Sequence, residues 1–183
     1  MHEVLSSDVI RVSEKDLKVE EVLSSAYPYE QGLVKIILGE EGSLTANHYG
    51  QVLSYPKHAI KIEGYERLNQ KLWYQCRDMA KYYSHRGPLS AHLFLSPKDS
   101  HSFPLHTDPD DVILIMLKGR KVIEVDGERI ELVDTPVDSL RAGSAGAPIR
   151  VLYMPAGTPH RAINTEDSIM LSIGLDAYMV KKL

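Results

Sequence analysis

The sequence predicts one domain that is mainly β, an antiparallel sandwich or barrel with flanking helices. Three observations indicate this fold class. Beyond residue 91, short apolar runs alternate with tight turns rich in glycine, proline and aspartate. Residues 64–85 instead repeat apolar side chains every three or four positions, the spacing of an amphipathic helix. A chain of 183 residues with 43% hydrophobic content can bury one ordinary core.

Composition and charge exclude several classes of protein. The formal net charge is -4, and no basic cluster indicates nucleic-acid binding. Cys76 is the single cysteine, so an internal disulfide is impossible, which fits a reducing compartment. Residues 1–12 lack the basic and apolar regions of a secretory signal, and the apolar run Val112–Leu117 is too short to span a bilayer. We therefore expect a cytoplasmic protein with neither nucleic-acid nor membrane partners.

The first 63 residues are expected to contribute short elements without recognisable chemistry. Ser13 followed by Glu14 is a helix start. The two histidines of this region, His48 and His58, are expected to be ordinary surface or packing residues. The expected elements are a strand at Val9–Val12, a helix from Ser13 to about Ser24 whose pattern ends at Pro28, a strand at Leu33–Leu38 and a weaker, patchily alternating strand candidate at Ala46–Ser54.

Residues 64–85 are expected to form the one long helix, which ends at Arg86-Gly87-Pro88. Its apolar stripe is predicted to pack against a sheet. The stripe consists of Tyr65, Leu68, Leu72, Trp73, Cys76, Met79, Ala80 and Tyr83.

The remainder is expected to be strands. Asp126-Gly127 is a strong two-residue hairpin signal, and residues 134–149 are expected to be a loop near the site. The expected strands are His92–Leu95, Leu105–Asp108, Val112–Leu117, Lys121–Val125, Glu128–Val133, Arg150–Met154, one that opens at His160, and Ser168–Leu175.

The triplet His106-Thr107-Asp108 carries the first indication of chemistry. On an extended strand, residues two apart share a face, so the imidazole of His106 and the carboxylate of Asp108 are expected to point the same way. Such a pair is two-thirds of the two-histidine, one-carboxylate triad that binds non-heme Fe(II). His160 is the candidate for the third ligand.

Two resemblances meet around these residues. The segment PAGTPHRAIN, from Pro155 to Asn164, resembles the second cupin motif, although Ile149 stands where an upstream glycine is usual. The first cupin motif normally contains His-x-His and a later glutamate, and this chain has His106-Thr107-Asp108 instead. That difference favours an oxygenase site over a plain cupin metal site.

Residues 91–176 also resemble the JmjC family of Fe(II)/2-oxoglutarate oxygenases, most closely its ribosomal-oxygenase and asparaginyl-hydroxylase branch. The similar stretch is AHLFLSPKDSHSFPLHTDPDDVILIMLKGRKVIEV, followed by VLYMPAGTPHRAINTEDSIMLSIGL. The resemblance implies a double-stranded β-helix (cupin or jelly-roll) core in a single domain spanning residues 1–183, which residues 1–90 support. Phe103 departs from the branch, whose hydroxylases can carry a threonine at that position to hold the co-substrate.

The resemblance implies Fe(II), 2-oxoglutarate and O2, with His106, Asp108 and His160 as the catalytic metal ligands. Lys121, fifteen positions after His106, matches the lysine that pairs with the distal carboxylate of 2-oxoglutarate in this branch. The hydroxyls of Ser172 and Thr107 are weaker candidates for orienting the co-substrate. The implied reaction hydroxylates a protein or peptide side chain, or a small metabolite, and releases succinate and CO2.

Two other functions stay open from sequence. A cupin metalloenzyme of another class, an isomerase or a dioxygenase that needs no 2-oxoglutarate, would bind metal without the co-substrate. A non-enzymatic cupin binding module would not bring the three ligands together. Among further polar residues, His101 and the Asp110-Asp111 pair are minor candidates for substrate contact, and Arg161 and Arg120 are expected to point away from the site by strand alternation.

Overall fold

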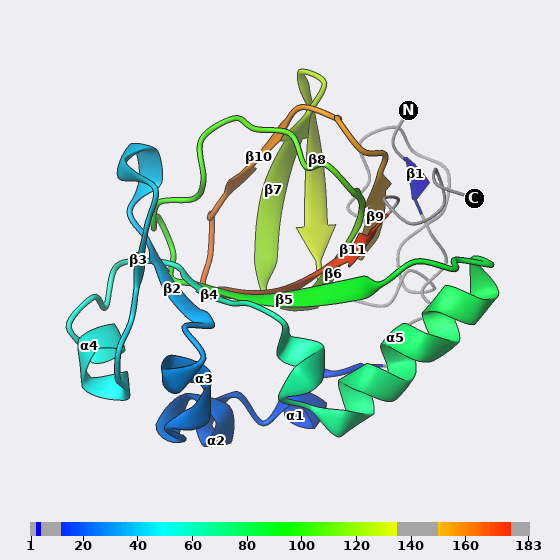
Figure 1. Cartoon of the computed structure of the whole chain (residues 1–183). Coiled ribbons are helices and arrows are strands. Elements are labelled where there is room, and N and C mark those ends of the chain that lie inside the picture. The colour runs from blue at the N-terminus through cyan, green and yellow to red at the C-terminus, as the bar shows by residue number, and fades with distance from the viewer. Residues whose placement is uncertain (1–2, 5–11, 135–149, 177–183) are drawn as a thin grey trace.

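The computed structural model describes residues 3–4, 12–134 and 150–176, and within them it shows two antiparallel sheets and a layer of helices (Figure 1). The larger sheet has the strand order β1-β9-β6-β11-β5-β4-β2-β3, and the smaller has β10-β7-β8. The strands of the two sheets are β1 (Glu3–Val4), β2 (Val34–Ile37), β3 (Ser43–Thr45), β4 (Ile60–Ile62), β5 (Leu89–Ser96), β6 (Asp111–Lys118), β7 (Arg120–Val125), β8 (Glu128–Val133), β9 (Val151–Met154), β10 (His160–Ile163) and β11 (Ser168–Leu175).

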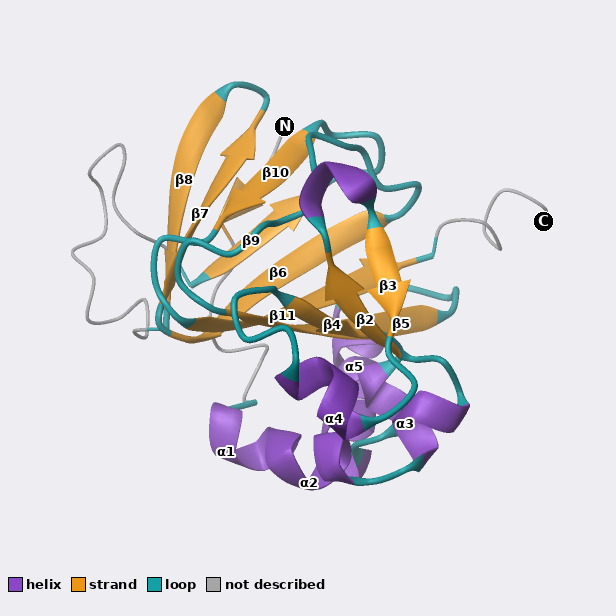
Figure 2. Cartoon of the chain, turned by 90° about the vertical axis from the view of Figure 1, so that its left-hand side faces the viewer, coloured by secondary structure: helices purple, strands orange, loops and turns teal. Residues whose placement is uncertain are grey.

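The smaller sheet faces the central strands of the larger one, and the helices cover the larger sheet's other face (Figure 2). The arrangement is the expected jelly-roll double-stranded β-helix with flanking helices. The helical elements are α1 (Glu14–Leu17), α2 (Val19–Ser24), α3 (Tyr27–Glu30), the 3-10 turn η2 (Gly39–Glu41), α4 (Tyr49–Leu53), the 3-10 turn η3 (Tyr65–Arg67) and α5 (Gln70–Tyr82).

Strand β6 explains why the longest apolar run in the sequence is continuous. Ile113 and Ile115 belong to the core between the large sheet and the helices. Val112, Leu114 and Met116 belong to the core between the two sheets. Because both faces of this strand are buried, both sets of alternating side chains must be apolar.

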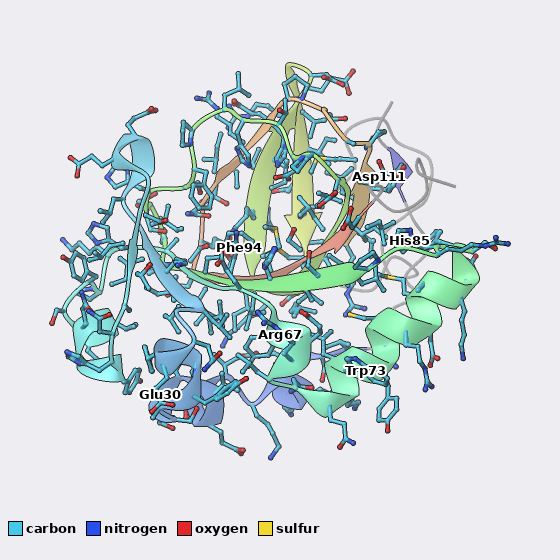
Figure 3. All side chains as sticks on the ribbon, viewed as in Figure 1. Glu30, Arg67, Trp73, His85, Phe94 and Asp111 are labelled. Carbon is cyan, nitrogen blue, oxygen red and sulfur yellow. The ribbon has the colours of Figure 1, made fainter. Side chains whose placement is uncertain are left out.

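Labelled side chains show the same division into two faces (Figure 3). Phe94 lies on the side of β5 that faces the small sheet, whereas Arg67 and Trp73 lie on the helical side. The Phe94 side of β5 therefore faces the space between the two sheets.

The N-terminal expectations are partly corrected. The single helix expected from Ser13 breaks in two at Lys18, which adopts a left-handed conformation with φ 53°. Pro28 does not end the helical region, because it occupies the first turn of α3, where the missing N–H of proline has no intrahelical partner to lose. The strand candidate Ala46–Ser54 is wrong: it contains helix α4, whose N-cap is His48.

The long helix is confirmed but starts later than its apolar stripe. Asn69 caps α5 by accepting a hydrogen bond from the Leu72 N–H, and its amide donates to the carbonyls of Asp16 and Leu17. Trp73 is 47% exposed, so its assignment to the packing face is wrong. The actual packing face depends on Leu72, Cys76 and Met79.

The β core follows the sequence closely, with one exception. Asp126 and Gly127 both have positive φ, 50° and 85°, as the expected primed hairpin turn requires. Leu105–Asp108 is not a strand; it lies in a loop with a single β-bridge between His106 and His160. The loop expected at 134–149 and the strand expected at Val9–Val12 lie almost wholly outside the described residues.

Within the described part of the chain, no helix is both long and apolar enough to cross a membrane. The expected cytoplasmic location stays a prediction.

Candidate metal site and cavity

His106 and His160 are held side by side by their backbones. The loop that follows β5 carries His106 to the first residue of β10, where two reciprocal hydrogen bonds join the residues: His106 N–H to His160 O at 3.1 Å and His160 N–H to His106 O at 2.9 Å. Their imidazole centroids are 4.4 Å apart. A β-bridge between two segments that are distant in the sequence, and not a strand at Leu105–Asp108, therefore positions His106.

Asp108 completes a cluster of three potential metal ligands. Its Oδ2 lies 3.4 Å from His160 Nε2, and its backbone carbonyl accepts a hydrogen bond from the Gly157 N–H at 2.8 Å. One ligand atom from each of His106, Asp108 and His160 lies within 4.8 Å of the others. The sequence expectation that these three side chains come together is met by the geometry.

The hydrogen bonds of the two imidazoles fit a metal. His106 Nδ1 lies 2.8 Å from the Pro104 carbonyl, and His160 Nδ1 lies 3.0 Å from the Thr158 carbonyl. Because a carbonyl can only accept, each Nδ1 donates a proton to its carbonyl, which leaves Nε2 as the ring nitrogen available to a metal. Backbone carbonyls orient metal-binding histidines in the same way in known metal sites.

A cavity of about 150 Å³ opens beside this cluster, between the two sheets. Alternate residues of β5 line it: Ser90, His92, Phe94 and Ser96. The lining comprises Ile37, Ala59, Lys61, Ser90, His92, Phe94, Ser96, Ser102, Phe103, His106, Asp108, Pro109, Asp110, Val112, Leu114, Lys121, Ile123, His160, Ala162, Met170, Ser172 and Gly174.

Lys121 projects into this cavity from β7 and is 1% exposed. Its Nζ donates to Ser96 Oγ at 2.9 Å and lies 5.9 Å from the Phe94 ring centroid. Within the described residues it forms no ion pair, and burial lowers the pKa of Lys121 from 10.5 to about 7. A buried ammonium without a counter-ion is costly, so the position suits a group that binds an anion.

The two weaker co-substrate candidates separate. Ser172 lines the cavity on β11, opposite His92 in the strand register. Thr107 is exposed and is absent from the cavity lining. Of the two candidates, Ser172 therefore lies where it could contact a molecule in the cavity.

The neighbouring acids and one histidine differ in their surroundings. Asp110 lines the cavity. Asp111 accepts hydrogen bonds from the Tyr153 hydroxyl and the Ala156 N–H, so it anchors the turn before His160. His101 is exposed and absent from the cavity lining.

The two arginines follow strand alternation, as expected. Arg161 pairs with Glu124 on the neighbouring strand. Arg120 pairs with Glu131 at 2.8 Å on the face opposite the buried Lys121.

Sequence reasoning missed His92 and Ser96 as cavity residues. The imidazole of His92 accepts a hydrogen bond from the Gly64 N–H at 3.3 Å, and burial, together with the nearby Lys61 ammonium, lowers the pKa of His92 to about 4. The signal was present: from Ser90 to Ser96 every second residue is polar or aromatic within an otherwise apolar strand. That alternation marks the face of β5 that is not packed on the helices.

Asn164, the last residue of the cupin-like motif, braces the loop that carries the two ligands. The side-chain NH2 of Asn164 donates to Ser100 O, Ser100 Oγ and Ser102 Oγ at 2.9–3.0 Å, and its backbone carbonyl accepts a hydrogen bond from the Asp99 N–H. Asn164 is 3% exposed. The motif therefore ties the strand of His160 to the loop of His106.

Replacing Asn164 by alanine is expected to lower the free energy of unfolding by about 1–3 kcal/mol, because buried acceptors on Ser100 and Ser102 lose their donor. Urea unfolding of the metal-free protein measures this change. Thr158→Ala, at a partly exposed position of the same motif whose side chain makes no hydrogen bond among those found in the described residues, is the control and should change stability by less than about 0.5 kcal/mol. Equal stability of the parent and the Asn164 variant would contradict the bracing role.

Comparison with known proteins adds family information. A family model described as the JmjC domain matches residues 64–183. A bifunctional lysine-specific demethylase and histidyl-hydroxylase NO66 of Drosophila persimilis is 30% identical over 98 residues, which are 49% of this chain and 14% of that protein. The protein of the same description from Dictyostelium discoideum is 23% identical over 161 residues, covering 79% of this chain and 30% of that protein. The chain thus spans less than a third of these relatives.

Among solved structures, YcfD, a ribosomal oxygenase from Escherichia coli in complex with cobalt and succinic acid, superposes with a TM-score of 0.61. The match covers 96% of this chain and 48% of that one at 18% sequence identity. At this identity the likeness shows the shared fold.

Proposed function

Since the chain belongs to the JmjC domain family, we propose that it is an Fe(II)- and 2-oxoglutarate-dependent oxygenase that hydroxylates a protein or peptide side chain, or a small metabolite. The observation that carries this proposal is a pairing inside one cavity. A two-histidine, one-carboxylate cluster lies at its wall, and a buried ammonium without a counter-ion lies in the same lining. The first suits non-heme Fe(II) with open coordination positions, and the second suits a carboxylate.

In the proposed site, His106 and His160 would hold the metal through Nε2, and Asp108 through a carboxylate oxygen. When bound, Fe(II) would supply the redox chemistry that couples oxidative decarboxylation of 2-oxoglutarate, which yields succinate and CO2, to insertion of one oxygen atom of O2 into the substrate. The protein's own contribution is to orient and to enclose. The carbonyls of Pro104 and Thr158 fix the ring orientations of the two histidines.

Lys121 would bind the distal carboxylate of 2-oxoglutarate as a point charge. The apolar residues Leu114, Ile123 and Met170, which line the cavity, would exclude water from the two methylene carbons of 2-oxoglutarate. An anion beside Lys121 favours the charged ammonium, so binding would raise the pKa of this lysine again.

The substrate class rests on the relatives. The names of two of them describe a histidyl-hydroxylase, and a third similar protein is described as a ribosomal oxygenase. These descriptions favour a protein or peptide side chain as the substrate. Because this chain spans only part of each of them, a small metabolite remains the second member of the proposal.

An anaerobic titration tests the proposed function. Fe(II) is added to the metal-free protein, followed by 2-oxoglutarate, while the visible metal-to-ligand charge-transfer absorption is recorded. We expect the band to appear with 2-oxoglutarate in the parent protein and to be absent with His160→Ala. His101→Ala is the matched control, because it removes an exposed histidine of the same loop region, and it should keep the band.

Metal binding without a band at any concentration of 2-oxoglutarate would defeat the proposal. That result would favour the alternative of a cupin metalloenzyme that uses no 2-oxoglutarate. Absence of metal binding in the parent would favour a non-enzymatic binding module.

A further inference from the structure

The outer face of α5 presents aromatic side chains to solvent, on the side of the large sheet that faces away from the cavity (Figure 3). Trp73, the single tryptophan of the chain, is 47% exposed, Tyr74 is 43% exposed and Tyr82 is 67% exposed. Packing does not account for these rings, because other residues of α5 form its buried face. Exposed large side chains that gather on one face of a protein commonly mark an interaction surface.

Basic side chains stand among these rings. The guanidinium carbon of Arg77 lies 5.7 Å from the ring centroid of Trp73 and 5.1 Å from that of Tyr74. The two rings meet edge to face, with their centroids 5.3 Å apart. Residues four apart on a helix are neighbours on its surface, so Trp73, Arg77 and Lys81 follow one another along α5. Trp73, Tyr74, Arg77 and Lys81 are referred to below as the α5 stripe.

The charge around the α5 stripe is opposite to that of the whole chain. Residues 67–86 carry five basic side chains and one acidic side chain, Asp78, whereas the chain has a formal net charge of -4. Asp78 is 58% exposed and lies 3.5 Å from Arg77 and 4.0 Å from Lys81. Ion pairs this exposed contribute little, so both cations can turn to another anion. Lys71 is left out of the stripe because Asp16 binds it at 2.6 Å.

Aromatic rings interleaved with cations are typical of proteins that bind single-stranded nucleic acid, since bases stack on the rings and the cations pair with phosphates. The core of a protein interface is instead depleted in lysine and other charged residues. A helix that lies on a membrane needs an exposed aliphatic face, and Leu72 and Met79 of α5 are buried. From Trp73 to Lys81 the helix rises about 12 Å, which is the length of three or four stacked nucleotides at about 3.4 Å each.

We propose that the outer face of α5 binds single-stranded nucleic acid, whose bases stack on Trp73 and Tyr74 and whose phosphates pair with Arg77 and Lys81. RNA and DNA share this chemistry. The surface is separate from the cavity, because the helices cover the opposite face of the large sheet (Figure 2). Net charge and runs of basic residues, on which the expectation of no nucleic-acid partner depends, do not reveal this helix, because the basic residues between 67 and 86 are four to six positions apart.

Fluorescence of Trp73 tests the proposal directly. The full chain is titrated with oligo(U) and with oligo(dT) of about twelve nucleotides, within the usual range of site sizes. Because the chain has one tryptophan, its emission reports on this surface alone. We expect saturable quenching by one or both oligonucleotides. The slope of log K against log salt concentration should be about -1.4, or about -0.7 for each of the two phosphates paired.

Variants are compared through the fluorescence anisotropy of a labelled oligonucleotide. Trp73→Ala and Tyr74→Ala should each weaken binding by about 5- to 100-fold, the usual effect of losing one stacked base, and Trp73→Phe should retain most of the affinity. Arg77→Gln should reduce the size of the salt slope by about 0.7. The matched controls are Tyr27→Ala, 52% exposed on α3, and Arg120→Gln, 48% exposed beside 47% for Arg77, and neither should change affinity or slope.

Three results would overturn the proposal. The first is the absence of quenching by either oligonucleotide at about 50 mM salt, where phosphate contacts are strong. The second is equally tight binding of poly-L-glutamate of the same length, which would make the surface a site for an acidic protein segment. The third is an equal loss of affinity in the two control variants. The thermal midpoint and Co(II) affinity of every variant should stay at the parent values, so failure here leaves the proposed oxygenase function standing.

Discussion

Replacement of Asp108 by alanine is expected to lower the affinity for divalent metal by at least about 100-fold and to leave the fold intact. The loss should exceed the roughly 10- to 100-fold effect of changing a residue that only supports a ligand, because a direct ligand disappears. The fold should survive because the Asp108 side chain is about one-third exposed and its Oδ2 faces Nε2 of His160 in the cavity, not the packed core. The backbone contact with Gly157 does not depend on the side chain.

Calorimetric titration with Co(II), together with thermal unfolding, measures both parts of this expectation. Asp110→Ala is a matched control, because Asp110 is an acid of the same loop and lines the same cavity but does not belong to the ligand cluster. Unchanged Co(II) affinity in Asp108→Ala, or an equal loss in Asp110→Ala, would refute the assignment of Asp108 as a ligand.

The second large effect is expected at Lys121, and it has opposite signs for binding and for stability. Lys121→Met should abolish measurable 2-oxoglutarate binding, because it removes the one cation of the cavity lining that is fully buried among the described residues. The same change should raise the free energy of unfolding at pH 7 by a few kcal/mol. A pKa of about 7 in place of 10.5 corresponds to a penalty of roughly 5 kcal/mol on the charged side chain, at about 1.4 kcal/mol per pKa unit. Loss of the hydrogen bond to Ser96 offsets about 1–3 kcal/mol of that gain.

The dependence on pH gives this prediction a separate signature. The pKa of Lys121 is lowered in the folded protein, so between about pH 7 and pH 10.5 the unfolded chain binds more protons than the folded one. The destabilising effect of Lys121 is therefore greatest at and below about pH 7, and the free energy of unfolding increases as the pH rises from about 7 toward 10.5. The slope is at most about 1.4 kcal/mol per pH unit.

Urea unfolding of the ligand-free parent and of Lys121→Met at pH 7 and pH 9 measures the difference. The parent should gain stability relative to the variant over this interval. Lys118→Met is the control, because that lysine is exposed and pairs with Glu14 at the surface. A Lys121→Met variant that is less stable than the parent at pH 7, or that still binds 2-oxoglutarate with parental affinity, would show that the lysine has a structural role instead.

Much of this site could be predicted from sequence because its residues lie in local patterns with short-range causes. Alternation along an extended segment placed His106 and Asp108 on one side, and the motif around His160 marked the third ligand. The hairpin at Asp126-Gly127 followed from the positive φ that this turn demands. The fifteen-residue offset to Lys121 came from family resemblance.

Other features depended on contacts that no local pattern encodes. The helix expected from Ser13 onward is interrupted at Lys18. Trp73 lies outside the packing face of its helix. In both cases tertiary packing, and not the local sequence pattern, decides the outcome. His106 reached its position through backbone bonds to His160, fifty-four residues away in the chain, and without a strand of its own.

By itself, the sequence determined the fold class, the order of most strands, and the residue types able to bind a metal and a carboxylate, since periodicity and turn chemistry act over a few residues. Only the tertiary structure decided that Asn164 braces the loop of His106, that Ser172 and not Thr107 faces the cavity, and that Ser96 meets Lys121 in a buried recess. These pairings join separate strands, and the register between strands is set by burial of whole faces, which no short stretch of sequence contains.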